Sequence, residues 1–136
     1  MDLVKAIKIS ASGMKAQGVR LRVISENIAN VNSLAETPGG DPYRRKLVTF
    51  KDALDKTMGA HVVQVNKIDF DQSDFNKRYD PTHPAADKDG YVMTPNVNSL
   101  TEMMDMREAQ RSYSANLDMI ESSKRMIERT IDLLRA

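Results

Sequence analysis

The fold is decided by residues 3–31, LVKAIKISASGMKAQGVRLRVISENIANV, whose apolar side chains recur at alternating intervals of four and three residues. This period is typical of a helix that keeps one narrow stripe against a partner helix. Asp2 is a suitable N-cap, and Asn32 and Ser33 end the pattern. We predict a long helix whose contact stripe, the N-terminal seam, has Ser10 and Gln17 as polar members and these apolar members: Leu3, Ile7, Met14, Leu21, Ile24, Ile28 and Val31.

The same period returns in residues 103–134, which no Pro or Gly interrupts. Ser99 and Glu102 have the spacing of a capping box, in which each side chain accepts a hydrogen bond from the other residue's backbone N–H. The second contact stripe, the C-terminal seam, has Gln110 and Lys124 as polar members and these others: Met103, Met106, Tyr113, Leu117, Ile120, Ile127, Ile131 and Leu134. Two helices that each need a partner along a narrow stripe indicate a subunit that completes its folding by assembling.

Composition excludes several classes of protein. The sequence of 136 residues is 40% apolar but only 5% aromatic and lacks Trp, so we expect an elongated chain with a small core. Its 20 basic and 19 acidic residues nearly cancel, which disfavours binding to nucleic acid or anionic lipid. The absence of Cys excludes thiol catalysis and disulfides. No apolar run approaches 18 residues, so we expect no insertion into a membrane.

Residues 34–98 are predicted to form a small module that contains β-structure. The Pro- and Gly-rich loop 36–42 cannot continue the first helix. Residues 47–50 are β-prone, and Phe50 also opens a candidate helical turn through Met58. From His61 the apolar residues alternate, with a phase shift before Ile68 that a β-bulge would produce, and residues 91–93 form another strand. The prediction is an α+β fold: helix 1–33 and helix 99–136 pair as a coiled coil around module 34–98.

No residue cluster supports catalysis. His83 lies beside three aspartates, but placing Gly90 at the sixth position of an EF-hand puts Asn96 at the twelfth, where a bidentate carboxylate is needed. A histidine between prolines is typical of a turn. No nucleophile elbow and no phosphate-binding glycine motif is present. We therefore expect no enzyme, no catalytic or metal-binding residue, no cofactor and no small-molecule substrate.

Several motifs resemble those of the bacterial flagellar rod and hook proteins. The first is Ser25-Glu26-Asn27-Ile28-Ala29-Asn30, followed by Thr37-Pro38-Gly39 and Tyr43-Arg44-Arg45-Lys46. Further similar segments are Asp80-Pro81-Thr82-His83-Pro84, Gly90-Tyr91-Val92, Pro95-Asn96-Val97 and Arg111-Ser112-Tyr113-Ser114-Ala115-Asn116. The resemblance covers essentially the whole chain, and its motif residues are Asn27, Ile28, Ala29, Asn30 and Tyr43.

The resemblance implies a structural subunit of the basal-body rod. In this family the paired terminal helices form an inner α-helical tube and the β module lies outside, as part of the drive shaft between motor and hook. The implied partners are other rod subunits and further copies of the chain in a helical stack. Export through the flagellar type III apparatus, without a cleaved signal peptide, would place the protein in the periplasmic rod.

Two interpretations stay open. In this export system a Phe-x-x-x-hydrophobic segment is thought to dock on the export gate, and Phe50-Lys51-Asp52-Ala53-Leu54 resembles it. Phe50 and Leu54 would share one face of a helical turn, but they are equally suited to the core of the module. For the whole chain, the alternative is a cytosolic helical adaptor that uses the same seams in a closed coiled-coil oligomer.

Overall fold

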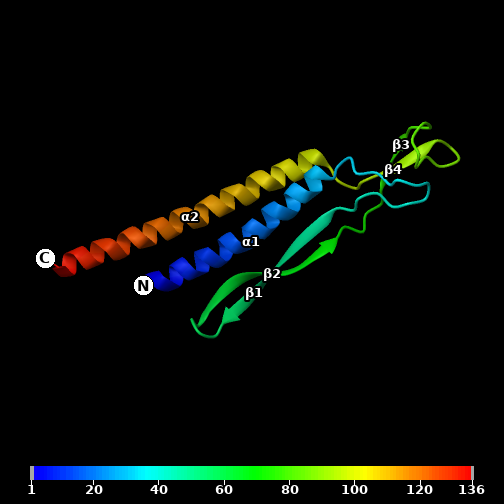
Figure 1. Cartoon of the computed structure of the whole chain (residues 1–136). Helices are drawn as coiled ribbons and strands as arrows, with labels where there is room; N and C mark the ends of the chain where they lie inside the picture. Colours follow the sequence, from blue (N-terminus) through cyan, green and yellow to red (C-terminus); the bar gives the residue numbers. More distant parts are fainter. Residues whose placement is uncertain (1, 136) are drawn as a thin grey trace.

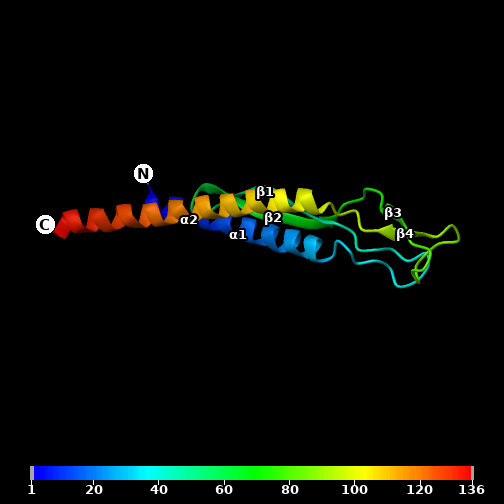
Figure 2. The ribbon, with the colours of Figure 1, turned by 90° about the horizontal axis from the view of Figure 1, so that it is seen from above.

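The computed structural model describes residues 2–135 as an elongated α+β chain, in agreement with the sequence prediction. Two long helices, α1 (Leu3–Ala29) and α2 (Ser99–Arg135), lie side by side and run in opposite directions (Figure 1). A hairpin of β1 (Lys46–Asp55) and β2 (Ala60–Phe70) lies along α1. A smaller hairpin of β3 (Asn76–Tyr79) and β4 (Tyr91–Thr94) lies at the far end from the termini. Seen from above, the chain is narrow (Figure 2).

The helix pair is antiparallel along the length of α1. Asn27, near the end of α1, donates a hydrogen bond to Glu102, near the start of α2. Further along, a Cβ added to Gly13 would lie 2.9 Å from the side-chain nitrogen of Asn116, so glycine permits the close approach of the two helices there. α2 continues past the start of α1 (Figure 1), and its last turns carry exposed apolar residues: Ile131, Leu133 and Leu134.

For half of the C-terminal seam, the residue of α2 that is buried lies one position before the predicted one. Ala109 and Ser123 are buried, whereas the predicted members one residue later, Gln110 and Lys124, are exposed. The seam members that are partly buried are Met106, Tyr113, Ile120 and Ile127, and those that are exposed are Met103, Leu117, Ile131 and Leu134. Small side chains let the helix backbones approach closely, so small residues occupy the centre of the contact and larger ones its sides.

α1 buries residues on two faces rather than along one stripe. Ser10 and Ile24 of the N-terminal seam are buried, and so are Ala16 and Val23, which lie outside the seam. The other apolar seam members are partly buried: Leu3, Ile7, Met14, Leu21, Ile28 and Val31. The second buried face exists because the β1–β2 hairpin packs against α1, with Val62 of β2 buried.

The predicted N-cap of α1 is confirmed, and the predicted cap of α2 is wrong. The Asp2 carboxylate accepts a hydrogen bond of 3.2 Å from the backbone N–H of Lys5. At the start of α2 the capping side chain is Asn98, whose Oδ1 accepts from the N–H groups of Leu100 and Thr101 at 3.0 and 3.3 Å. Glu102 takes no part in a capping box because its carboxylate is buried in contacts with other elements.

The first hairpin contains the predicted bulge but not the predicted helical turn. Thr49 pairs with Lys67 and Phe50 with Val65, so Asn66 is the extra residue. β1 stays extended through Asp55, which contradicts the helical turn from Phe50 to Met58. The strands are joined by a turn in which Gly59 has a φ of +60°. Pairing with β2 therefore overrides the helical pattern of this segment.

The second hairpin confirms the predicted strand at 91–93 and pairs it with β3. The rings of Tyr79 and Tyr91 meet edge to face, with centroids 5.3 Å apart. His83 forms part of the preceding turn, as predicted, because its Nδ1 accepts a hydrogen bond from the N–H of Ala85. Within residues 2–135, neither helix has an apolar stretch long enough to cross a membrane.

Candidate functional site: a polar junction between helices and hairpin

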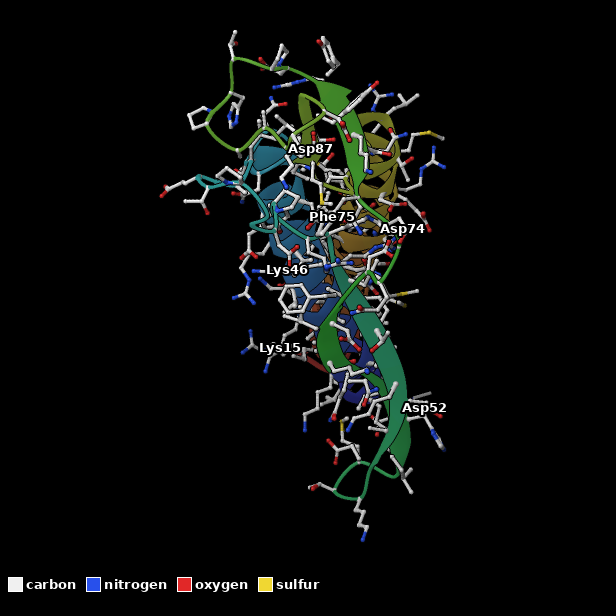
Figure 3. The ribbon with its side chains drawn as sticks, turned by 90° about the vertical axis from the view of Figure 1, so that its right-hand side faces the viewer. Lys15, Lys46, Asp52, Asp74, Phe75 and Asp87 are labelled. Atoms are coloured by element: carbon white, nitrogen blue, oxygen red, sulfur yellow. The ribbon has the colours of Figure 1, made fainter. Side chains whose placement is uncertain are left out.

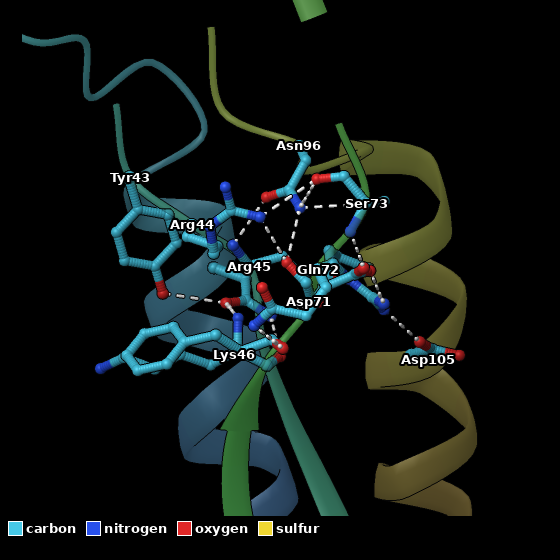
Figure 4. Close-up of polar contacts among 12 residues, drawn as sticks. Tyr43, Arg44, Arg45, Lys46, Asp71, Gln72, Ser73, Asn96 and Asp105 are labelled. Atoms are coloured by element: carbon cyan, nitrogen blue, oxygen red, sulfur yellow. Dashed lines mark hydrogen bonds and ion pairs between the residues drawn. The ribbon is translucent and has the colours of Figure 1, made fainter. Parts of the chain in front are cut away.

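Four segments meet at one polar cluster, which we call the junction: the end of α1, the start of α2, the start of β1 and the end of β2 (Figure 4). Its central side chains are those of Asn27, Tyr43, Arg45, Asp71 and Glu102. Viewed from the β3–β4 end, Asp52 lies further along β1 than Lys46, the first residue of that strand (Figure 3). The junction is where the hairpin is attached to the helix pair.

Asn27 joins three segments through one side chain and is only 1% exposed. Its Oδ1 accepts from the backbone N–H of Lys46 and from the Tyr43 hydroxyl, both at 2.9 Å. Its Nδ2 donates to the Lys46 carbonyl at 2.9 Å and to Glu102 at 3.1 Å. The amide thus satisfies both backbone groups of Lys46 at the point where β1 begins. No residue with only donors or only acceptors could make this set of bonds.

Arg45 makes the corresponding connection between β1, β2 and α2. Its guanidinium donates to Glu102, which is 0% exposed, and pairs with Asp71 at 3.4 Å and with Asp105 at 3.5 Å. Burial by itself lowers the pKa of Arg45, but the bonds to Glu102 and Asp71 outweigh it and raise that pKa above its usual value. The buried carboxylate therefore has a permanent cationic partner, without which its burial would be costly.

A second layer of bonds attaches the end of β2. The Asn96 side chain accepts from the backbone N–H of Arg45 at 2.8 Å and donates to the Asp71 carbonyl at 3.1 Å. Arg44 donates to the same carbonyl at 2.9 Å, and its guanidinium lies 4.1 Å from the centre of the Phe75 ring. Hydrogen bonds from the backbone and side chain of Ser73 lower the pKa of Asp71, with a further contribution from Arg45.

Ion pairs extend the junction along both helices. Lys46 pairs with Glu26 at 3.0 Å, which raises the pKa of that lysine. Arg20 reaches Asp105 and Glu108 of α2 at 3.8 and 3.5 Å. Burial raises the pKa of Tyr43, whose hydroxyl remains a donor to Asn27. Every central group thus has a partner in another segment, so the arrangement fixes geometry and leaves no group free to react.

The fold brings only two of the five predicted family-motif residues together in the junction. Asn27 and Tyr43 meet in the junction, Ile28 is partly buried, and Ala29 is exposed. Asn30 is the C-cap residue of α1, and its N–H and side-chain nitrogen both donate to the Glu26 carbonyl. Among residues 2–135 no group of three acidic or histidine side chains could hold a metal ion.

Sequence reasoning missed Arg45, Asp71, Asn96 and Glu102. The basic cluster Arg44-Arg45-Lys46 can be seen in the sequence, but such a cluster is typical of an exposed turn as well as of a protein contact. Glu102 has the spacing of a capping residue. Pairing between residues 45 and 102 cannot be read from local spacing, because the fold brings them together across 57 residues.

The segments that form the junction lie in regions similar to known proteins. Residues 7–33 match the family described as Flagella basal body rod protein, and residues 88–133 match the one described as Flagellar basal body rod FlgEFG protein C-terminal. The chain is 54% identical over 134 residues to the flagellar basal-body rod protein FlgC of Agrobacterium fabrum, covering 98% of this chain and 96% of the relative.

Two more distant relatives carry the same description. The FlgC of Borreliella burgdorferi is 40% identical over 153 residues, with 99% of both chains covered. The FlgC of Bacillus subtilis is 38% identical over 148 residues, covering 98% of this chain and 99% of the relative. In each comparison the similarity extends over both helices and the β module between them.

Proposed function

Since the chain belongs to the FlgC family of flagellar basal-body rod proteins, we propose that its helix pair packs against neighbouring subunits in a helical stack within the proximal part of the rod. The protein is a structural subunit of the rod and not an enzyme. The closed cytosolic oligomer is set aside, because every matched family consists of rod proteins.

One observation carries the proposal: α2 exposes apolar side chains along a length that α1 does not cover. Within residues 2–135, Ile131, Leu133 and Leu134 are 45%, 78% and 83% exposed. Exposed apolar residues that follow one another along a helix are typical of an interface with another molecule. Contacts that repeat without closing generate a helical filament, and this is the architecture that a rod requires.

The test is to place a charge on this uncovered part of α2. Ile131→Asp should leave the far-ultraviolet circular dichroism and unfolding free energy of the purified subunit unchanged, because Ile131 packs little within the monomer. In cells it should abolish swimming and remove the protein from isolated basal bodies, detected by immunogold microscopy. Ser114→Asp adds the same charge at another exposed position of α2 and should swim normally.

The proposal fails if wild-type protein is missing from isolated basal bodies, or if Ile131→Asp cells swim as well as wild type. Loss of swimming in both variants would also contradict it, because the effect would then follow charge rather than position.

The junction suits a subunit that carries torque. Rod rotation would load the attachment between the helix pair and the outer β hairpin, and Asn27 and Arg45 each join segments on both sides of that attachment. Because these bonds are buried or partly buried and connected to one another, they resist bending better than isolated surface ion pairs.

Export is the second part of the proposal. The subunit would leave through the flagellar type III apparatus without signal cleavage, with Phe50 and Leu54 docking on the export gate and the mature subunit in the periplasmic rod. Phe50 and Leu54 are 37% and 54% exposed on β1, which weighs against their serving as core residues. Residues four apart lie on one face of a strand as well as of a helical turn, so the pair stays on one face in either conformation.

Phe50→Ala should hold intact subunit in the cytoplasm, measured by immunoblotting of cell and medium fractions in a strain that lacks the downstream rod. Phe70→Ala is the matched control, because Phe70 is also an exposed phenylalanine of the same hairpin. Normal secretion of Phe50→Ala, or equal loss in both variants, would rule out docking by this pair.

A further inference from the structure

The chain exposes apolar side chains at both of its far ends (Figures 1 and 2). At one end Leu133 and Leu134 project from the last turns of α2. At the other end the β3–β4 hairpin exposes Tyr79, Tyr91 and Met93. These three residues share one face of the hairpin, because Tyr79 pairs with Tyr91 and residues two apart on a strand point to the same side. An elongated subunit therefore has an apolar surface at each extreme.

A small cavity lies beside this face of the hairpin. Its volume is about 70 Å³, and Tyr91 and Met93 form part of its lining. Small residues from two loops also line it: Ala35, Gly39, Gly40 and Ala85. A water molecule needs only about 10–15 Å³, so the cavity is large enough for a branched apolar side chain. A Cβ added to Gly39 would meet no atom within 4 Å, which shows that the space beside this glycine is open.

The charges at the two ends are opposite in sign. In the turn beside the cavity Arg78 pairs with Asp80, and the remaining charges are Asp87, Lys88 and Asp89, of which Asp87 lines the cavity. Near the end of α2 Lys124 pairs with Glu128, and the remaining charges are three arginines and one aspartate: Arg125, Arg129, Arg135 and Asp132. Complementary charge of this kind selects a partner and fixes its register.

We propose that the cavity of one copy receives Leu134 of a second copy, so that the uncovered end of α2 packs against the β3–β4 hairpin of its neighbour. Leu134 enters the cavity beside Met93, and Arg135 comes within reach of Asp87. This inference rests on the proposed helical stack and names the surface that covers the end of α2 within it. The receiving surface belongs to the β module, so the contact is distinct from packing of one helix along another.

The contact repeats along the length of the subunit. The β3–β4 hairpin lies beyond the start of α2 (Figure 1), so copies in the same orientation are displaced by about 55 Å or more, the length of the 37 residues of α2. Two different surfaces meet, and each copy keeps one of each kind for a further neighbour. Such a contact continues without closing on itself.

Cysteine cross-linking tests the proposal without background, because the natural sequence contains no Cys. Met93→Cys combined with Leu134→Cys should give a ladder of covalent multimers from isolated basal bodies after mild oxidation, seen on a non-reducing gel. The two positions lie at opposite ends of the chain, so a disulfide between them must join different copies. Tyr91→Cys combined with Leu134→Cys tests the same contact from a second lining residue. Met93→Cys combined with Met119→Cys is the control, because Met119 is an exposed methionine in the middle of α2.

Charge rescue tests the contact in swimming cells. Met93→Asp and Leu134→Lys should each cause loss of swimming, because each places a charge in an apolar contact. Combined in one chain they should restore swimming, since the two charges then meet between copies. Met93→Asp combined with Met119→Lys should not restore it.

A ladder in either test pair, with none in the control pair or in single-cysteine variants, would support the proposal. No ladder although the variants are present in basal bodies would overturn it, because another surface or another rod protein then covers the end of α2. If the cysteine variants are missing from basal bodies, the charge rescue decides: restored swimming supports the contact, and failure to restore it overturns the contact. These results leave the proposed function intact, whereas absence of the wild-type protein from basal bodies would overturn the proposed function itself.

Discussion

Asn27 is the residue on which the attachment of hairpin to helices depends most directly. Asn27→Ala would leave the Lys46 backbone groups and the Glu102 carboxylate without their buried partner. Each orphaned buried group costs about 1–3 kcal/mol, so we expect the unfolding free energy to fall by roughly 2–4 kcal/mol in urea titration of the purified subunit.

Asn32→Ala is the matched control for that substitution. Asn32 is an exposed asparagine just after α1, and its replacement should change the unfolding free energy by less than about 0.5 kcal/mol. Equal effects of the two substitutions would mean that the Asn27 bonds are not the source of stability.

Asp71 makes the junction sensitive to acid. Its pKa is lowered in the folded chain by the Ser73 backbone and side chain and by Arg45, so folding favours its ionised form. The stabilisation is present above the unfolded pKa of about 3.9 and is lost as pH falls through the lower folded value. We expect the unfolding free energy to decrease below about pH 4, and to decrease less steeply in Asp71→Asn. Identical slopes for the two proteins would contradict this assignment.

At the scale of single elements, Asn98 and Ser99 are the two candidate capping residues at the start of α2, and substitutions distinguish them. Asn98 caps the helix with its side chain, so Asn98→Ala should lower the unfolding free energy by about 1 kcal/mol. Ser99→Ala should have almost no effect, although the sequence places Ser99 in a capping box. Urea titration of both variants tests which residue caps the helix. A larger loss of unfolding free energy in Ser99→Ala than in Asn98→Ala would restore the capping-box interpretation.

Local periodicity was enough to predict the elements but not how they meet. The heptad pattern identified both helices, and the phase shift before Ile68 identified the bulge at Asn66. The predicted contact stripe of α2 was displaced from the buried one. The prediction followed the apolar residues Met103 and Leu117, whereas close packing of the helices buries small residues such as Ala109 and Ser123. The helical turn after Phe50 failed because pairing with a distant strand outweighs local preference.

The candidate site was harder to predict than the fold. The family resemblance identified Asn27 and Tyr43, but spacing could not show what they bind. Arg45 and Glu102 each had an adequate local interpretation, as a turn residue and a cap, so nothing in the sequence demanded a buried pair between them. Long-range polar contacts of this kind depend on the register of several elements at once, which one sequence does not specify.

At the scale of the whole molecule, stability should decrease along the chain's length, from the junction toward the two termini. The junction end holds the buried polar network, whereas the opposite end has α2 alone beyond the start of α1, with Leu133 and Leu134 exposed. Local opening costs least where few contacts cover the backbone. In hydrogen exchange of the purified subunit we therefore expect the slowest amides near Asn27 and Ala109 and the fastest helical amides after Ile127. Assembly would supply the missing contacts, so the same late amides should become protected in isolated rods. Uniform protection along α2 in the monomer would mean that the helix is stable without neighbours, and that its exposed apolar residues are not needed to complete its folding.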